Sequence, residues 1–177
     1  MLFHSLLEQG GGDYVNQMQV GIDGLDPERF RAAWQAVVDA HPILRTAFAW
    51  QGGLPQPVQV VHKQLEVPFS VLDWRDHNDQ PAALQALAAA ELAQGFALNQ
   101  PGLLRLVLVR LDERHSELLY THHHILMDGW SNSQLLGEVL QRYAGQVPPP
   151  SGGRYRDYRA WLPRQEPPAG HPVWRAP

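Results

Sequence analysis

The stretch that decides the fold is Leu103–Leu111, L-L-R-L-V-L-V-R-L. It is apolar and branched except for Arg105 and Arg110, which is typical of a central strand whose two faces are both covered. A turn at Asp112–His115 follows, and Glu117–Ile125 predicts a second strand. Two strands joined by so short a turn pair as an antiparallel hairpin. We therefore expect a sheet that contains this hairpin.

Two amphipathic helices are predicted before the hairpin. The first is capped by Asp26 and ends before Pro42, and the second begins after Asn78 or Asp79 and stops at Gly95. Their apolar residues recur every three to four positions, so one face of each helix packs on a core. These residues are Phe30, Ala33, Trp34, Val37 and Val38 in the first helix, and Leu84, Leu87, Ala88 and Leu92 in the second.

Three short strands and a third helix complete the pattern. Leu44–Trp50 and Val58–Val61 are predicted to pair across a glycine turn, and Pro68–Leu72 is a candidate third strand. After the hairpin, Ser131 followed by Gln134 has the pattern of a helix capping box. Because strands alternate with helices and some strands are linked as hairpins, we predict an α+β fold with helices packed on a mixed β-sheet.

Composition and charge argue against several classes of function. The chain has 177 residues, of which 44% are hydrophobic and 18% charged, enough for one core. The net charge of −4 leaves no basic excess, so we expect neither nucleic acid nor a membrane as a partner. The absence of cysteine excludes disulfides, cysteine-ligated metals and a thiol nucleophile. Without a membrane-length apolar run or a signal peptide, a cytoplasmic location is expected.

The end of the chain differs in composition from the rest. Eight of the 15 prolines lie in the last 32 residues. A compact domain rarely ends in this way. We expect one lobe at residues 1–146 and, at residues 147–177, a proline-rich linker with a short aromatic helix at Tyr155–Leu162.

Residues 120–131, Y-T-H-H-H-I-L-M-D-G-W-S, carry the candidate chemistry. Side chains alternate along a strand, so His122 and His124 are predicted to share one face and His123 the other. A first interpretation is zinc binding by His122 and His124, although no other histidine has an informative spacing, and we expect no metal. A second is that the three histidines are structural.

A third interpretation is a histidine that acts as a general base or polarises a substrate. Asp128 would then fold back to brace the loop that follows the strand. Gly129 would allow the backbone to approach a substrate or to take a positive φ angle.

These residues resemble a known family. His123–Ser131 looks like the HHxxxDG signature of condensation domains of nonribosomal peptide synthetases, which belong to the superfamily of chloramphenicol acetyltransferase. His41–Phe48 resembles the upstream R-H-x-x-L-R-T-x-F motif of the family, with Ala40 in place of the first arginine. Met1–Leu6 resembles the end of the family's first motif, and Tyr155–Leu162 the segment that leads into its second lobe.

The resemblance implies a two-lobed enzyme of which this chain is the N-terminal lobe, a two-layer lobe like one acetyltransferase subunit. In the family, two carrier proteins bring substrates on phosphopantetheine arms to a histidine at the seam of the lobes. The α-amine of the acceptor aminoacyl thioester attacks the donor acyl thioester and forms an amide. The implied partners are thus carrier proteins and a C-terminal lobe, and the chain itself binds no cofactor.

The resemblance also assigns roles to residues. His124, the second histidine of the motif, is the catalytic one, either as a general base or as an anchor for the amine and the tetrahedral intermediate. His123 and Asp128 are expected to be structural, with Asp128 paired to Arg45. Gly129 is expected to offer its backbone N–H to the developing oxyanion.

Two alternatives remain beside this interpretation. One is a coenzyme A-dependent acyltransferase of the same superfamily, which shares the H-x-x-x-D-G pattern. The other is a non-catalytic lobe that only binds a carrier protein. Because an isolated lobe exposes the apolar face that normally meets its partner, we also expect self-association and little or no activity from this chain alone.

Overall fold

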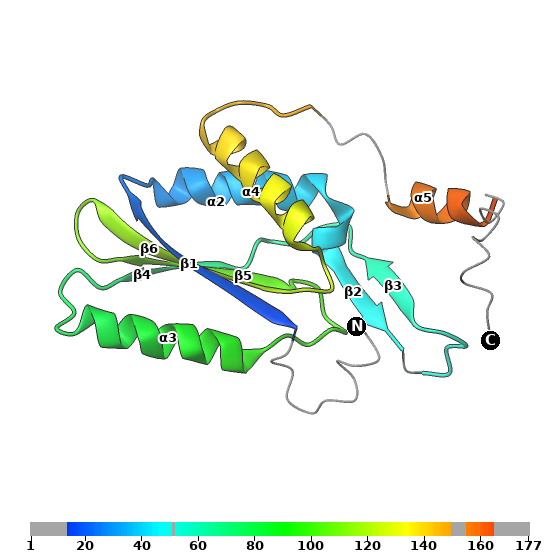
Figure 1. The fold of residues 1–177 in the computed structure, drawn as a ribbon, viewed down its shortest axis with the longest axis horizontal. Helices are drawn as coiled ribbons and strands as arrows, with labels where there is room; N and C mark the ends of the chain where they lie inside the picture. The colour runs from blue at the N-terminus through cyan, green and yellow to red at the C-terminus, as the bar shows by residue number, and fades with distance from the viewer. Residues whose placement is uncertain (1–13, 51, 150–154, 165–177) are drawn as a thin grey trace, which may run out of the picture.

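A four-stranded sheet with helices against it forms the main body of the molecule (Figure 1). The structure is a computed structural model that describes residues 14–50, 52–149 and 155–164. The strands are β1 (Val15–Asp23), β2 (Thr46–Ala49), β3 (Val58–Val61), β4 (Phe69–Asp73), β5 (Leu104–Arg110) and β6 (His115–His123). The helices are α2 (Pro27–Ala40), α3 (Gln80–Gln94), α4 (Gly129–Tyr143), α5 (Tyr155–Trp161) and the short 3₁₀ helices η1 (Pro42–Arg45) and η2 (Leu162–Arg164).

The main sheet is mixed. Its strand order is β1-β6-β5-β4, with β4 parallel to β5 and the other neighbours antiparallel. Strands β2 and β3 form a separate antiparallel pair. The predicted α+β class and the predicted β5–β6 hairpin are both confirmed, and the hairpin occupies the middle of the sheet. Strand β6 ends at His123, two residues before the predicted end, so His124 lies just beyond it.

Helices cover both faces of the sheet (Figure 1). On one face, α2 and α4 pack on a core that includes the fully buried Trp34, Leu108 and Tyr120. On the other, α3 packs through Leu84 on a smaller cluster that includes Val109. The lobe therefore has one layer more than the two expected. The reason is β5, whose side chains are apolar on both faces, so that each face needs a cover.

The predicted helix ends are largely correct. The carboxylate of Asp26 accepts the backbone N–H groups of Glu28 and Arg29 and caps α2. Gly95 ends α3 at a φ angle of 57°, which favours glycine. The predicted strand at Leu44–Trp50 is partly wrong, because its first residues form η1 and β2 begins only at Thr46.

Strand β1 was not among the predicted elements. It pairs with β6 along its whole length, from Val15 opposite His123 to Asp23 opposite His115. The signal that could have revealed it is the alternation of Met18, Val20 and Ile22 with polar residues and glycine. Its pairing places the residues at its start beside the histidines at the end of β6.

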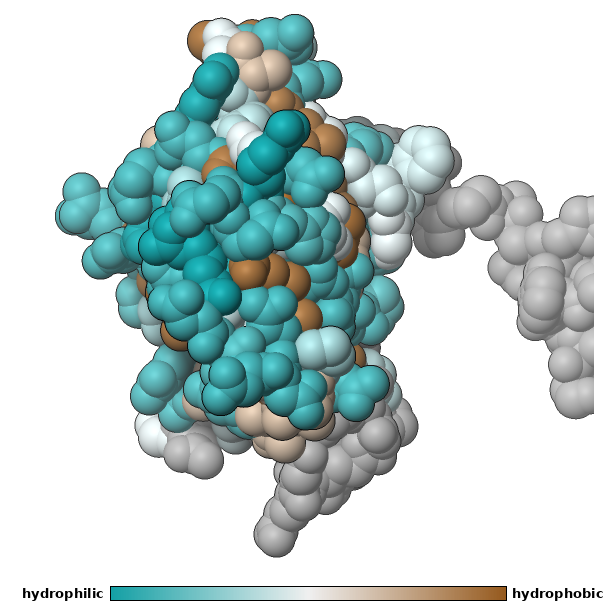
Figure 2. Space-filling view, turned by 90° about the vertical axis from the view of Figure 1, so that its left-hand side faces the viewer, coloured by the Kyte–Doolittle hydropathy of each residue, from teal (hydrophilic) through white to brown (hydrophobic). Residues whose placement is uncertain are grey.

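The two ends of the sheet differ in character. Figure 2 shows the end that carries the β5–β6 turn, and its surface is largely hydrophilic. Arg75 there pairs with Asp73 at 2.8 Å and with Glu113 at 2.5 Å. Within the described residues, no helix is both long enough and apolar enough to cross a membrane. The three consecutive histidines lie at the opposite end of β6, away from this hydrophilic surface.

Candidate active site at the end of β6

The three consecutive histidines differ sharply in burial. His122 is 5% exposed and His123 is 3% exposed, whereas His124, the first residue past the strand, is only partly buried. A residue that reacts with a substrate must be reachable, so burial already separates the three roles. His124 is the histidine whose position suits chemistry.

His122 belongs to the core. Its ring stacks on the ring of Tyr120, with centroids 4.8 Å apart and planes 18° apart. Burial lowers the pKa of His122 to about 4, so the ring is neutral near pH 7. Among the described residues, its Nδ1 atom has no hydrogen-bond partner, which also suits an uncharged ring. The hydroxyl of Tyr120 donates to Asn132 Oδ1 at 3.0 Å and ties this cluster to the first turn of α4.

His123 braces the loop that follows the strand. Its Nδ1 atom accepts the backbone N–H of Ile125 at 3.0 Å. An accepting Nδ1 carries no proton, so the neutral ring has its proton on Nε2. Burial lowers the pKa of His123, in keeping with a neutral ring. The structural role of His123 stays a prediction, and the loop contact through Nδ1 is the observation that favours it.

The backbone of His124 is tied to the start of β1. Its N–H donates to the carbonyl oxygen of Tyr14 at 2.7 Å. Its ring Nδ1 lies 3.3 Å from the amide nitrogen Nδ2 of Asn16 on β1. Sequence analysis missed this contact because it missed the strand that carries Asn16.

Asp128 orders the loop by capping α4. Its Oδ1 atom accepts the backbone N–H of Ser131 at 2.8 Å, so the helix begins at Gly129. This hydrogen bond holds the pKa of Asp128 below its usual value. The prediction that Ser131 caps the helix is therefore wrong, although Ser131 supplies the capped N–H. Aspartate and serine are both good N-cap residues. Because β6 ends two residues earlier than predicted, α4 also begins earlier, at Gly129.

The predicted pair of Arg45 and Asp128 is wrong. The guanidinium of Arg45 instead donates to backbone carbonyl oxygens, and no ion pair among the described residues joins it to Asp128. The acceptors are Val38 at 3.1 Å and Asp39 at 3.3 Å in the last turn of α2, and His62 at 2.5 Å and Lys63 at 2.8 Å after β3. Carbonyl groups at a helix C-terminus lack partners within the helix, and a planar five-donor group satisfies several of them at once.

His41, from the same upstream motif, makes the contact with α4. Its Nε2 atom lies 2.7 Å from Glu138 Oε2, and Arg142 bonds the same carboxylate at 2.7 Å. Burial alone would raise the pKa of Glu138, but hydrogen bonds from His41 and Arg142 outweigh it and hold the pKa below its usual value. Sequence analysis gave His41 no such role. The upstream motif thus fixes α4, and α4 carries Asp128 and Gly129.

Gly129 occupies the first position of α4. Within the described residues, no group accepts a hydrogen bond from its backbone N–H. No atom of the described part of the chain lies within 4 Å of a Cβ atom added here, so these residues leave the space beside the peptide open. A free N–H at a helix N-terminus favours negative charge, which suits the predicted contact with an oxyanion.

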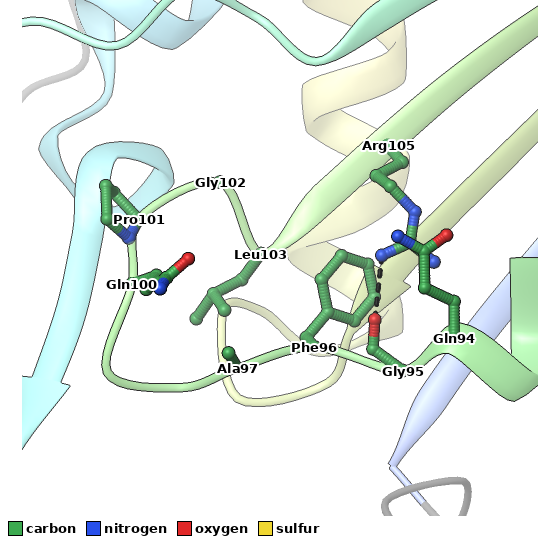
Figure 3. Close-up of a pocket in the computed structure, with 9 residues that line it drawn as sticks. All are labelled: Gln94, Gly95, Phe96, Ala97, Gln100, Pro101, Gly102, Leu103 and Arg105. Carbon is green, nitrogen blue, oxygen red and sulfur yellow. Dashed lines mark hydrogen bonds between the residues drawn. The ribbon is translucent and has the colours of Figure 1, made fainter.

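The loop between α3 and β5 contacts His123 at the end of β6. The carbonyl oxygen of Leu103 accepts the N–H of His123 at 2.9 Å, and the Phe96 ring meets the His123 ring edge-on at 6.5 Å. Figure 3 shows Arg105 beside the Phe96 ring and bonded to the carbonyl oxygen of Gly95. These residues line a surface hollow of about 270 Å³. No three histidine or carboxylate side chains of the described residues come together as a metal site would require.

Comparison with known families identifies the chain. The family model for the condensation domain matches residues 1–169. The chain belongs to the condensation domain family. The resemblance predicted from its motifs is confirmed, and the chain corresponds to the N-terminal part of a condensation domain.

This condensation domain chain matches short segments of much longer synthetases. One of the linear gramicidin synthase proteins of Brevibacillus parabrevis is 40% identical over 99% of this chain and 4% of its own length. Chondramide synthase cmdD of Chondromyces crocatus is 36% identical over 94% of this chain and 4% of its own length. The starter condensation domain of rhizomide synthetase RzmA shares the fold, with a TM-score of 0.78 at 23% identity over 92% of this chain and 42% of that chain. The chain thus spans less than half of that solved structure.

The separate contacts of Arg45 and Asp128 predict additive losses of stability. Asp128→Ala removes a helix cap and should lower the Tm of the condensation domain chain by about 2–4 °C. Arg45→Ala should also lower the Tm, because it leaves two part-buried carbonyl groups, those of Val38 and His62, without this donor. The double variant should lose the sum of the two shifts in thermal unfolding. A double variant that loses clearly less than the sum would indicate that Arg45 and Asp128 form an ion pair after all. Wild-type stability in Arg45→Lys would also indicate an ion pair, because lysine keeps the charge and lacks the planar group.

The burial of His122 predicts weaker stability at acid pH. In the unfolded chain His122 takes up a proton near its ordinary pKa of 6.5, and in the folded chain only near 4. Between these values the unfolded chain binds more protons, so the free energy of unfolding falls as pH falls through this window. His122→Phe keeps a ring on Tyr120 without the titrating group and should flatten this decline in urea unfolding between about pH 7 and pH 5. His77→Phe makes the same change on an exposed turn and should keep the wild-type decline; an equal decline in all three proteins would contradict the assignment.

Proposed function

We propose that this chain forms one wall of a peptide-bond-forming site and that His124 is its reactive group. The observation that carries the proposal is the difference in exposure among the three histidines. His122 and His123 are 5% and 3% exposed and hold the core and the loop, whereas His124, just past the end of the strand, is only partly buried. Membership of the condensation domain family supplies the class of reaction.

The proposed reaction joins two thioester-bound substrates. The α-amine of the acceptor attacks the carbonyl carbon of the donor thioester, a C–N bond forms, and the C–S bond breaks. One proton leaves the amine nitrogen and one ends on the departing sulfur, so the products are an amide and a free thiol. His124 serves this sequence either as a general base or as a hydrogen-bonding anchor for the tetrahedral intermediate.

Two residues near His124, Gly129 and Asp128, are proposed to assist it in different ways. In this proposal the backbone N–H of Gly129 at the start of α4 donates to the developing oxyanion. Asp128 acts on architecture, because its carboxylate is engaged with Ser131 at 2.8 Å and so fixes where α4 begins. The same loop thereby carries both the histidine and the oxyanion donor.

The proposed partners follow from the part of the domain that this chain covers. A second lobe would supply the facing wall, since solved relatives are more than twice as long as the matched region. Carrier proteins would bring both substrates on phosphopantetheine arms, which are substrates rather than cofactors held by this chain. Synthesis on such carriers belongs in the cytoplasm. A coenzyme A ester as the preferred donor would instead favour an acyltransferase of the same superfamily.

Replacement of His124 tests the proposal. In the complete two-lobed domain, His124→Ala should lower single-turnover amide formation from loaded carrier proteins by about 10²-fold or more, the loss typical of a positioned acid–base group. His77→Ala makes the same change on the exposed turn after β4 and should leave the rate unchanged. Unchanged amide formation by His124→Ala, in a protein with wild-type thermal stability, would contradict the proposed role.

The 177-residue chain alone serves as a further arm of this experiment. Trp130 and Leu140 on α4 are 76% and 62% exposed, which is unusual for large apolar side chains on a solvated helix. We expect self-association in light scattering and no amide above background, because a catalytic group without positioned substrates loses most of its effect. Efficient condensation by a monomer of this chain would show that the second lobe is not required.

A further inference from the structure

We propose that Asn16 is a positioning residue that holds the neutral ring of His124 in the tautomer with its proton on Nε2. The effect of Asn16 on catalysis rests on the function proposed above, whereas its effect on the ring does not. Nothing in the family motifs points to Asn16, which precedes all of the histidines of the site by about a hundred positions and lies on a strand outside those motifs.

The fold brings Asn16 to the site through the register of β1. Asn16 lies directly opposite His122 in the β1–β6 pair. Residues directly opposite one another in a sheet share a face, and so do residues two apart along a strand. The side chain of Asn16 therefore lies on the face that His122 and His124 share, and its Nδ2 atom lies 3.3 Å from His124 Nδ1.

A second hydrogen bond restricts how the ring can move away. The N–H of His124 donates to the carbonyl oxygen of Tyr14 at 2.7 Å, two residues before Asn16. The backbone and the ring of His124 are thus both tied to the first residues of the same strand. Asn16 is exposed and His124 is partly buried, so the contact between their side chains lies near the surface.

The atoms involved set the direction of the hydrogen bond. The amide nitrogen of asparagine only donates, so Nδ1 of His124 must accept with its lone pair. A neutral imidazole with an accepting Nδ1 carries its proton on Nε2. His123 has the same tautomer for a similar reason, since its Nδ1 accepts from Ile125. Within the described residues, no group forms a hydrogen bond with Nε2 of His124, which leaves that N–H for a ligand.

This tautomer decides between the two roles proposed for His124, a general base and a hydrogen-bonding anchor. A neutral ring with its proton on Nε2 donates a hydrogen bond from that atom and cannot take a proton there. His124 would then anchor the oxyanion of the tetrahedral intermediate through Nε2–H. The proton that leaves the amine would reach the departing sulfur without passing through Nε2.

The tautomer can be measured without any turnover. In the ¹⁵N-labelled 177-residue chain, the ring nitrogens of His124 are assigned by their loss in His124→Gln. We expect Nδ1 to resonate as an unprotonated nitrogen and Nε2 as an N–H. Asn16→Asp replaces the donor with an acceptor of the same shape and should reverse the two signatures. Asn16→Leu removes the donor alone and should give averaged shifts, and it serves if the aspartate variant does not fold.

Asn78→Asp is the matched control. It makes the same chemical change on an exposed turn at the opposite end of the sheet and should leave the ring signatures of His124 as in the wild type. An unprotonated Nε2 in the wild-type chain would overturn the proposal, because the amide of Asn16 would then present its oxygen to Nδ1. Signatures unchanged in both Asn16 variants would also overturn it.

A parallel rate measurement separates this inference from the proposed function. In the two-lobed domain, Asn16→Asp should lower amide formation by roughly 10-fold or more, since a wrong histidine tautomer is costly in other enzymes. A reversed tautomer with an unchanged rate would support the role of Asn16 at the ring and contradict the role of His124 in the reaction.

Discussion

The site depends on how the end of β6 is held between its two neighbours. The N–H of His123 donates to Leu103, beside β5, at 2.9 Å, and the N–H of His124 donates to Tyr14, beside β1, at 2.7 Å. Successive amides thus bond to opposite sides, as in any central strand. The backbone hydrogen bonding of β6 thus continues to His124, the candidate reactive residue. It buries His122 and His123 while leaving the ring of His124 at the open end of the sheet.

The elements around this strand end support it from separate directions. Asp128 caps α4, and Tyr120 reaches Asn132 in the first turn of that helix at 3.0 Å. His41 meets Glu138 further along α4 at 2.7 Å, while Arg45 bonds carbonyl groups at the end of α2. Within the upstream motif, His41 thus contacts the helix that begins at Gly129, and Arg45 ties the end of α2 to the residues after β3. We expect a change at His41 to affect the site through the position of α4.

Much of the fold could be predicted from local pattern, and the errors concern contacts made over long distances. Asp26 and Gly95 mark helix ends through their own backbone chemistry, and the apolar run of β5 marks a covered strand. The partner of Arg45 could not be predicted, because opposite charge in a sequence does not show which carbonyl groups the fold brings near. Asn16 was missed with its strand, although Met18, Val20 and Ile22 alternate. His122 is buried with its ring stacked on that of Tyr120, a contact that a short sequence motif does not reveal.

We propose that, of the three adjacent histidines, His124 alone has a ring that a reagent can reach in the folded chain. Diethyl pyrocarbonate modifies accessible neutral imidazoles, and fragmentation of the peptide that contains all three can assign the modified residue. In the folded chain, we expect His124 to react faster than His122 and His123, which should stay protected until denaturant is added, with the exposed His77 as the reference for a reachable ring. Modification of His122 or His123 as fast as His124 in the folded chain, or a protected His124, would contradict the account.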